Sequence, residues 1–405
     1  MLFRSSNRGV KTKDWVNTTT DAVRIWTVTN GTLPTFGSYS SPTTPVNAVY
    51  SPGQLYKTIT IDEHNKQIIE FKDKEGKVIL KKVQLTAVAD DGIGSGHDGW
   101  LCTYYIYDDL NNLRCVIQPR GVEVISSNWD LTDATILAEQ CFRYEYDERN
   151  RVVIKKVPGA REVYMVYDYR DRLIMTQDGN STGNWIVTFY DELNRPVQTG
   201  SVSNSAFGTP GKTFVQHLTD AKDITKAPYP FNPATPPHPN LYQVWTKIGY
   251  DNYDNLPPGI GLTATLNTTY TTSPYITGAF NTFPDYAQEP VMSQQTKGMV
   301  AWTQTRVLST TSTFLHSINI YDEKGRVIQV KSKNITNGED ILTTQYSWTG
   351  QPLVTVQKIE KAGVPVQTTV TVTKKTYDDL GRVVKTENRQ SHTDRESTRL
   401  NSSHR

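Results

Sequence analysis

A short motif recurs along this chain. It consists of an aromatic residue, an aspartate, two variable positions, a glycine or asparagine, a basic residue and an apolar residue. The plainest copies are EYDERNRVV (145–153), IYDEKGRVI (320–328) and TYDDLGRVV (376–384). Units this short stack on one another to bury a core that none of them buries alone. The repeat therefore constrains the fold more than any other feature of the sequence.

Six copies contain a Tyr-Asp pair, and one copy has Phe71 and Asp73 in its place. Three residues after each aspartate lies a glycine, asparagine or aspartate, residue types that tolerate a positive φ better than others. The motif residues that we expect to build the turns are Asp73, Gly76, Tyr107, Asp108, Asn111, Tyr146, Asp147, Asn150, Arg151, Tyr167, Asp168, Asp171, Arg172, Tyr190, Asp191, Asn194, Arg195, Tyr321, Asp322, Gly325, Arg326, Tyr377, Asp378, Gly381 and Arg382.

The spacing predicts a β-hairpin tip at each copy. A type I turn favours aspartate at its first position, and a left-handed residue at the fourth gives the bulge of a three-residue hairpin loop. In such a hairpin Asp147 faces Arg151, and Tyr146 faces Val152; both are favourable cross-strand pairs. Weaker copies stand at IDEHNKQI (61–68) and YSWTGQPL (346–353), while YDNYDNLP (250–257) fits the pattern but precedes PPGIG, so that its assignment stays open.

Composition favours sheet. Only 36% of the residues are hydrophobic, with 22 tyrosines among them, and valine, isoleucine and threonine are frequent. Disordered chains are poor in aromatic and β-branched residues, whereas a sheet with one wet face alternates apolar and polar residues. We therefore predict an all-β fold of repeated β-hairpins in a long curved or spiralling antiparallel sheet. One short helix is expected near residues 131–140, with Asp130 as a possible N-cap.

The repeats divide the chain. We expect an incomplete N-terminal segment over residues 1–50, repeat arrays over 51–200 and 316–390, and a loop-rich, proline-containing insertion over 201–315 with sparse repeats. The proline-rich stretch 226–240 predicts an extended surface loop, or alternatively a docking segment for a partner. The tail, 391–405, is expected to be disordered or artefactual, because DRESTRLNSSH (394–404) resembles a translated sequencing-library adaptor.

The motif resembles the YD repeat of the Rhs repeat family, over roughly residues 50 to 390. The stretch from GWLCTYYIYDDLNNLRCVI to YDELNRPVQTG resembles Bacteroidetes-type Rhs proteins in particular. The resemblance implies a β-sheet shell, secreted or displayed at the cell surface, that encloses a C-terminal toxin or effector domain. On this interpretation the chain is a fragment, and its partner is the remainder of its own polypeptide.

Other classes of function receive little support from the sequence. A formal net charge of +2 gives no field for nucleic acid, and no apolar run is long enough to span a membrane. No secretory signal is visible at the start. Three cysteines do not suggest a disulfide framework.

The sequence also offers few candidate catalytic residues. DGIGSGHDGW (91–100) holds His97 and Asp98 near Ser95 and Cys102, but strand-like residues follow it where a phosphate loop would open a helix. We expect no catalytic, cofactor-binding or metal-binding residues. Two alternatives stay open: a carbohydrate- or protein-binding adhesin that uses exposed aromatics such as Trp100, Tyr104 and Trp348, and, third, a hydrolase with an unrecognised carboxylate pair.

Overall fold

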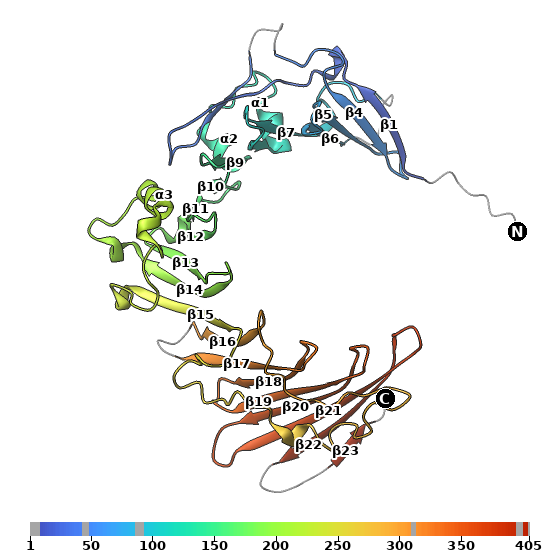
Figure 1. Cartoon of the computed structure of the whole chain (residues 1–405). Coiled ribbons are helices and arrows are strands. Elements are labelled where there is room, and N and C mark those ends of the chain that lie inside the picture. Colours follow the sequence, from blue (N-terminus) through green and yellow to red (C-terminus); the bar gives the residue numbers. More distant parts are fainter. Residues whose placement is uncertain (1–8, 43–47, 86–92, 309–312, 394–399, 404–405) are drawn as a thin grey trace, which may run out of the picture. The chain divides into compact units, whose positions relative to one another are not determined.

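The computed structural model describes residues 9–42, 48–85, 93–308, 313–393 and 400–403. Antiparallel strands dominate these residues, and strands that follow one another in the sequence pair in the sheet (Figure 1). The predicted all-β hairpin fold is therefore confirmed. Two compact units are present, Met1–Ile186 with Ser203–Asn232, and Val187–Val202 with Pro233–Arg405.

The strands of unit 1 pair in a simple order. The order is β1, β4, β5, β6, β7, β8, β9, β10, β11 and β12, while β2 and β3 form a separate hairpin. Their bounds are β1 Lys11–Val16, β2 Thr27–Thr29, β3 Ser38–Ser40, β4 Tyr56–Ile61, β5 Gln67–Lys72, β6 Val78–Gln84, β7 Trp100–Tyr107, β8 Leu113–Ile117, β9 Cys141–Tyr146, β10 Val152–Lys156, β11 Val163–Tyr167 and β12 Leu173–Asp178.

Among the described residues of unit 1, three α-helices interrupt the strands, where one was predicted: α1 (Pro119–Ile125), α2 (Ala134–Glu139) and α3 (Phe214–Lys222). The predicted helix is α2, but its predicted N-cap was wrong. The carboxylate of Asp133, rather than that of Asp130, accepts the N–H groups of Thr135 and Ile136 at 2.7 and 2.9 Å. Asp130 instead accepts hydrogen bonds from the N–H and hydroxyl of Thr132, a local turn that delays the start of the helix.

The core of unit 1 lies on one face of its sheet. Ile59, Ile69, Leu80 and Ile106 are all but inaccessible, and Val122 and Ile125 of α1 belong to the same core. Two buried lysines share this face, and the ammonium of Lys57 lies 2.5 Å from the Asp21 carboxylate. A buried charge of this kind requires such a partner.

Unit 2 continues the hairpin pattern. β13 (Asn184–Tyr190) begins in unit 1 and ends in unit 2. The remaining strands pair in sequence order, and they are β14 Pro196–Ser203, β15 Tyr242–Tyr250, β16 Val300–Arg306, β17 Phe314–Tyr321, β18 Val327–Lys333, β19 Glu339–Tyr346, β20 Pro352–Lys361, β21 Gln367–Tyr377, β22 Val383–Thr393 and β23 Leu400–Ser403. β23 pairs with β22, whereas residues 394–399 and 404–405 of the tail lie outside the described residues.

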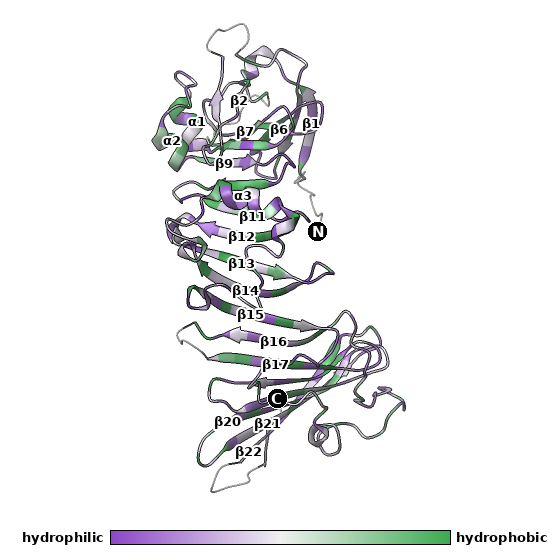
Figure 2. Ribbon diagram, turned by 60° about the vertical axis from the view of Figure 1, so that its left-hand side comes forward, coloured by the Kyte–Doolittle hydropathy of each residue, from purple (hydrophilic) through white to green (hydrophobic). Residues whose placement is uncertain are grey.

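Polar and apolar residues alternate along many of these strands (Figure 2). In β20, Val354 and Val356 are buried, whereas Thr355 is half-buried and Gln357 is exposed. This alternation is the wet-faced sheet that the composition favoured.

A long segment between β15 and β16, residues 251–299, covers one face of the unit 2 sheet; we call it the covering segment. Its Ile260 and Leu262 join a core with Trp302 and Ile318, and its Ile276 joins a second core formed by β20 and β21. The sequence alone did not predict this packing.

Buried amide side chains of the sheet hold the covering segment in place. The amide oxygen of Gln329 accepts the N–H of Asn267 at 2.8 Å, and its nitrogen donates to the Asn267 carbonyl at 3.0 Å. Gln345 forms the same pair with Thr277, at 3.0 and 2.9 Å. Both glutamines are fully buried. Each side-chain amide pairs with a backbone N–H and C=O of the covering segment, as the backbone of a neighbouring β-strand would.

The proline-rich stretch 226–240 contains no strand. Its Tyr229 is nevertheless buried, and the tyrosine hydroxyl lies 2.6 Å from Nδ1 of His217 in α3. This part of the stretch is therefore anchored on unit 1.

Candidate functional site: the hairpin tips

Each strong copy of the motif forms a turn. The residue three positions after the aspartate has a positive φ in all seven, namely Gly76 (85°), Asn111 (66°), Asn150 (57°), Asp171 (63°), Asn194 (63°), Gly325 (75°) and Gly381 (77°). The backbone N–H of that residue donates to the carbonyl of the aspartate in each case. The motif residues thus come together in separate tips, one for each hairpin.

The aspartate carboxylate is fully engaged within its own tip. At Asp147, Oδ1 accepts the N–H groups of Arg149 and Arg151 at 3.0 and 3.1 Å, while Oδ2 accepts Nε of Arg151 at 2.9 Å. Burial acts to raise the pKa of Asp147, but the hydrogen bonds from Arg151 and Arg149 outweigh it and the pKa is lowered. A carboxylate bound in this way has a structural role and is unavailable as a general acid.

The basic residue also reaches the following hairpin. Arg151 donates to Asp171 at 2.6 Å and lies over the ring of Tyr167, 4.7 Å from its centroid. The guanidinium of Arg326 lies 4.9 Å from the centroid of Tyr346 in the same way, and Lys77 lies 5.8 Å from that of Tyr107. A cation over an aromatic face is attracted by the ring quadrupole.

The tyrosine hydroxyl makes the reverse connection. Five tyrosines, each the last residue of its strand, donate to the carbonyl of the first residue of the preceding strand in the sheet. The pairs are Tyr146 with Leu113 (3.0 Å), Tyr250 with Pro196 (3.1 Å), Tyr321 with Val300 (2.8 Å), Tyr346 with Val327 (3.0 Å) and Tyr377 with Pro352 (2.9 Å). Within each unit the tips therefore form a ladder, in which side chains bond one hairpin to the next along the sheet.

The copy at Tyr250 contributes to the ladder without forming a hairpin tip. β15 ends at Tyr250, and the covering segment follows. Asp251 receives two hydrogen bonds from Arg195, at 2.9 and 2.6 Å, and these bonds together with the N–H of Gly298 lower its pKa. The Tyr250-Asp251 pair therefore connects the end of β15 to the preceding tip and does not form a hairpin tip.

The weaker copies form tips, and sequence reasoning missed one further tip. Asn65 and Gly350 have φ of 60° and 92°. In the missed tip, Asn334 takes the place of aspartate, and its side-chain oxygen accepts the N–H groups of Thr336 and Gly338 at 3.0 and 3.1 Å. Asn337 has φ of 66°. Searching for asparagine as well as aspartate at the first position would have found it.

Among the seven strong copies, the tip at Asp108 has Asn112 where the others have a basic residue, and a nearby arginine takes its place. Arg114, two residues after Asn112, donates to Asp108 at 3.2 Å and forms a buried ion pair with Glu145. Glu145 also accepts the N–H of Gly37 at 2.7 Å. The segment before β3 is thereby fastened to the sheet.

In the segment around His97, the side chains of His97 and Cys102 both contact the core of unit 1. Nε2 of His97 lies 2.8 Å from the hydroxyl of Tyr104, and burial, followed by the nearby Lys82 and Arg24 charges, lowers the pKa of His97 to about 4. Burial raises the pKa of the Cys102 thiol to about 11, so the thiol is a poor nucleophile. Residues 91 and 92 of this stretch lie outside the described residues.

One of the three aromatics expected to be exposed is fully buried. Tyr104 is 0% exposed, because alternation along β7 places it on the core face with Cys102 and Ile106. Trp100 is half-buried, with the Lys82 ammonium 4.9 Å from a ring centroid. Only Trp348, at 64% exposure, matches the expectation.

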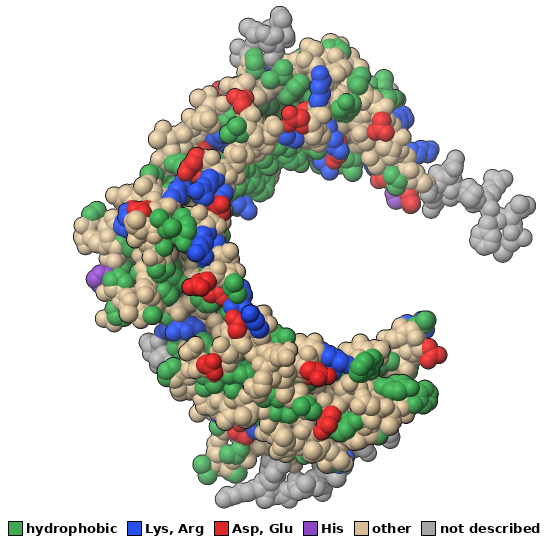
Figure 3. All heavy atoms as spheres, viewed as in Figure 1, with side chains coloured by type: hydrophobic (Ala, Val, Ile, Leu, Met, Phe, Trp, Pro, Cys, Tyr) green, Lys and Arg blue, Asp and Glu red, His purple; other side chains and the backbone are tan. Residues whose placement is uncertain are grey.

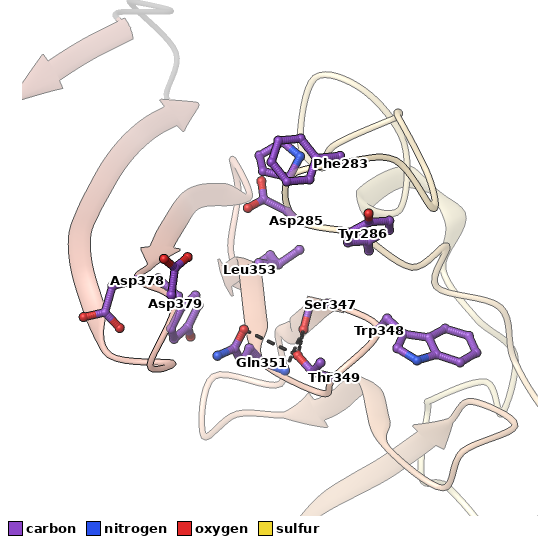
Figure 4. Close-up of a pocket in the computed structure, with 12 residues that line it drawn as sticks. Phe283, Asp285, Tyr286, Ser347, Trp348, Thr349, Gln351, Leu353, Asp378 and Asp379 are labelled. Atoms are coloured by element: carbon purple, nitrogen blue, oxygen red, sulfur yellow. Dashed lines mark hydrogen bonds between the residues drawn. The ribbon is translucent and has the colours of Figure 1, made fainter.

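A pocket of about 660 Å³ lies beside Trp348, between two hairpin tips and the covering segment (Figure 4). Its lining residues are Phe283, Pro284, Asp285, Tyr286, Ser347, Trp348, Thr349, Gln351, Leu353, Tyr377, Asp378 and Asp379. Pockets of this volume accommodate small ligands or single side chains.

Acidic and basic side chains are interspersed over each unit in the view of Figure 3. Among the residues described, no group of three or more His, Cys, Asp or Glu side chains is placed to hold a metal ion. A search of the same residues for a helix long and apolar enough to cross a membrane found none.

Comparison with known proteins gives limited similarity. No family model and no curated protein matches the chain. The chain is similar to a solved chain of the Tc holotoxin pore of Photorhabdus luminescens, at 12% identity and a TM-score of 0.34, over 82% of this chain and 17% of that one. A crystal structure of TcdB2-TccC3 matches at 12% identity and a TM-score of 0.36, over 87% of this chain and 18% of that one. The chain thus spans less than a fifth of these solved chains, and similarity this low is no basis for a shared function.

Proposed function

We propose that this chain is a structural segment of an Rhs-type protein and forms part of a β shell that encloses another part of the same polypeptide. In this role the chain carries no bond chemistry, and its working parts are the hairpin tips. The complete protein is secreted or displayed at the cell surface.

The observation that carries the proposal is the use of the motif residues in the ladder. Each tip aspartate is satisfied by its own turn, and the basic and tyrosine side chains bond neighbouring hairpins. Stacked hairpins of this kind extend a sheet without limit of length, because each contacts only its neighbours. Side chains bonded in this way stabilise an extended sheet, and this suits a structural role better than a role in an active site.

A protease-protection experiment tests enclosure. The coding sequence that flanks this chain is first recovered from source DNA by long reads across the codon for Asp394. The chain and the flanking segment are then expressed together and separately, and both samples are treated with the same protease. Enclosure predicts that the flanking segment survives only in the joint product. Digestion at equal rates, or a reading frame that ends as written, would refute the proposal.

A further inference from the structure

The pocket beside Trp348 has the chemistry of a cation site. Its twelve lining residues include four aromatic residues and three aspartates, and no lysine, arginine or histidine. The carboxylate of Asp378 is bound to Arg382 at 2.8 Å. Asp285 and Asp379, by contrast, have no hydrogen bond or ion pair within the described part of the chain, and both are exposed to solvent.

The two free carboxylates come from opposite walls. Asp285 belongs to the covering segment, next to Tyr286, and Asp379 belongs to the tip between β21 and β22. Figure 4 shows both side chains beside the space between the covering segment and the tip, with Phe283 and Tyr286 on the side of Asp285. Carboxylates stabilise a cation through charge, and aromatic faces stabilise it through their quadrupoles.

The rim of the pocket already holds a cation on an aromatic ring. The ammonium of Lys324 lies 3.4 Å from a ring centroid of Trp348. Trp348 projects away from Asp285 in Figure 4, so that Phe283, Tyr286 and the two carboxylates remain for a ligand.

We propose that this pocket binds the side chain of a lysine or arginine in an extended peptide segment. The site does not depend on the proposed function, since a basic peptide binds equally well whether or not the sheet encloses anything. Charge complementarity selects this occupant: two negative charges without counter-ions favour a ligand that brings positive charge.

A neutral sugar and a hydrolytic role fit less well. A neutral glycan would leave both carboxylates without a counter-charge. A glycosidase needs one carboxyl group kept protonated by an apolar environment, whereas Asp285 and Asp379 are both solvent-exposed.

The test is a ligand-observed NMR titration of the full chain with three short peptides. These are acetyl-Gly-Arg-Gly-amide, acetyl-Gly-Lys-Gly-amide and the citrulline counterpart, which matches arginine in shape but carries no charge. Asp285→Asn and Asp379→Asn each remove one pocket charge. Asp254→Asn removes one charge from an exposed position elsewhere in the covering segment and serves as the matched control.

We expect both basic peptides to bind and the citrulline peptide not to bind. Each pocket variant should weaken binding by about two- to fivefold, as for exposed charge pairs, while Asp254→Asn leaves it unchanged. Equal binding of the citrulline peptide, or unchanged affinity in both pocket variants, would overturn the proposal. Saturation by a neutral oligosaccharide such as maltohexaose, without binding of the basic peptides, would identify a glycan site instead.

Discussion

The hydroxyl of Tyr346 gives the sharpest test of the ladder. Tyr346→Phe keeps the ring under Arg326 but removes the hydroxyl that donates to the Val327 carbonyl at 3.0 Å. A hydrogen bond of this kind contributes about 1 kcal/mol to stability. Amide exchange in β18 and β19 should therefore become faster by about fivefold, since that free energy governs local opening.

Native-state hydrogen exchange measures this change hairpin by hairpin, which a single melting curve does not. Tyr286→Phe is the control, because Tyr286 lies in the same unit and donates no side-chain hydrogen bond within the described residues. If both variants leave exchange in β18 and β19 alike, the hydroxyl does not couple the hairpins and the ladder loses its main connection.

Three further changes probe the turns, the covering segment and a buried histidine. Gly350→Ala should lower the free energy of unfolding by denaturant by on the order of 1–2 kcal/mol, because φ is 92° at this position. Gly363→Ala should lower it less, because Gly363 lies outside the left-handed region. Equal losses would contradict the turn assignment. Gln345→Ala leaves the Thr277 N–H and carbonyl without partners, so limited proteolysis should cut residues 251–299 sooner than in the parent protein; unchanged cleavage would mean that the amide is dispensable. Because burial lowers the pKa of His97 to about 4, this histidine binds a proton at higher pH in the unfolded state than in the folded state. The free energy of unfolding should therefore fall by up to about 3 kcal/mol as the pH is lowered from about 6.5 to 4. His97→Gln should flatten that part of the pH profile.

The turns were accessible from the sequence because their chemistry is local. An aspartate and a residue that tolerates positive φ lie three positions apart, so that spacing alone indicates the tip. The bond from Tyr346 to Val327 spans 19 residues, and that from Tyr250 to Pro196 spans 54, so no short pattern reveals either. The motif therefore showed where hairpins turn but not how they are joined.

The burial of Tyr104 and the path of the covering segment could not be predicted from the sequence for the same physical reason. Whether a strand's aromatic side chain faces water depends on what covers the sheet, and Tyr104 is buried by segments far from it in sequence, such as Arg24, whose N–H bonds its hydroxyl at 2.9 Å. The covering segment has no periodicity of its own, since its path is set by side chains of the sheet, among them Gln329 and Gln345. Tertiary contacts of this kind leave no periodic signal in the segment that they position.

The amide pairs made by Gln329 and Gln345 attach the covering segment through its backbone at positions 267 and 277. Each glutamine binds the backbone N–H and C=O of Asn267 or Thr277, groups that nearly every residue type possesses. Replacement of the side chains at these two positions thus leaves the attachment intact, provided that the sheet keeps its glutamines. For protein engineering, this makes positions 267 and 277, rather than the buried Ile260, Leu262 and Ile276, the places where substitutions keep the segment attached.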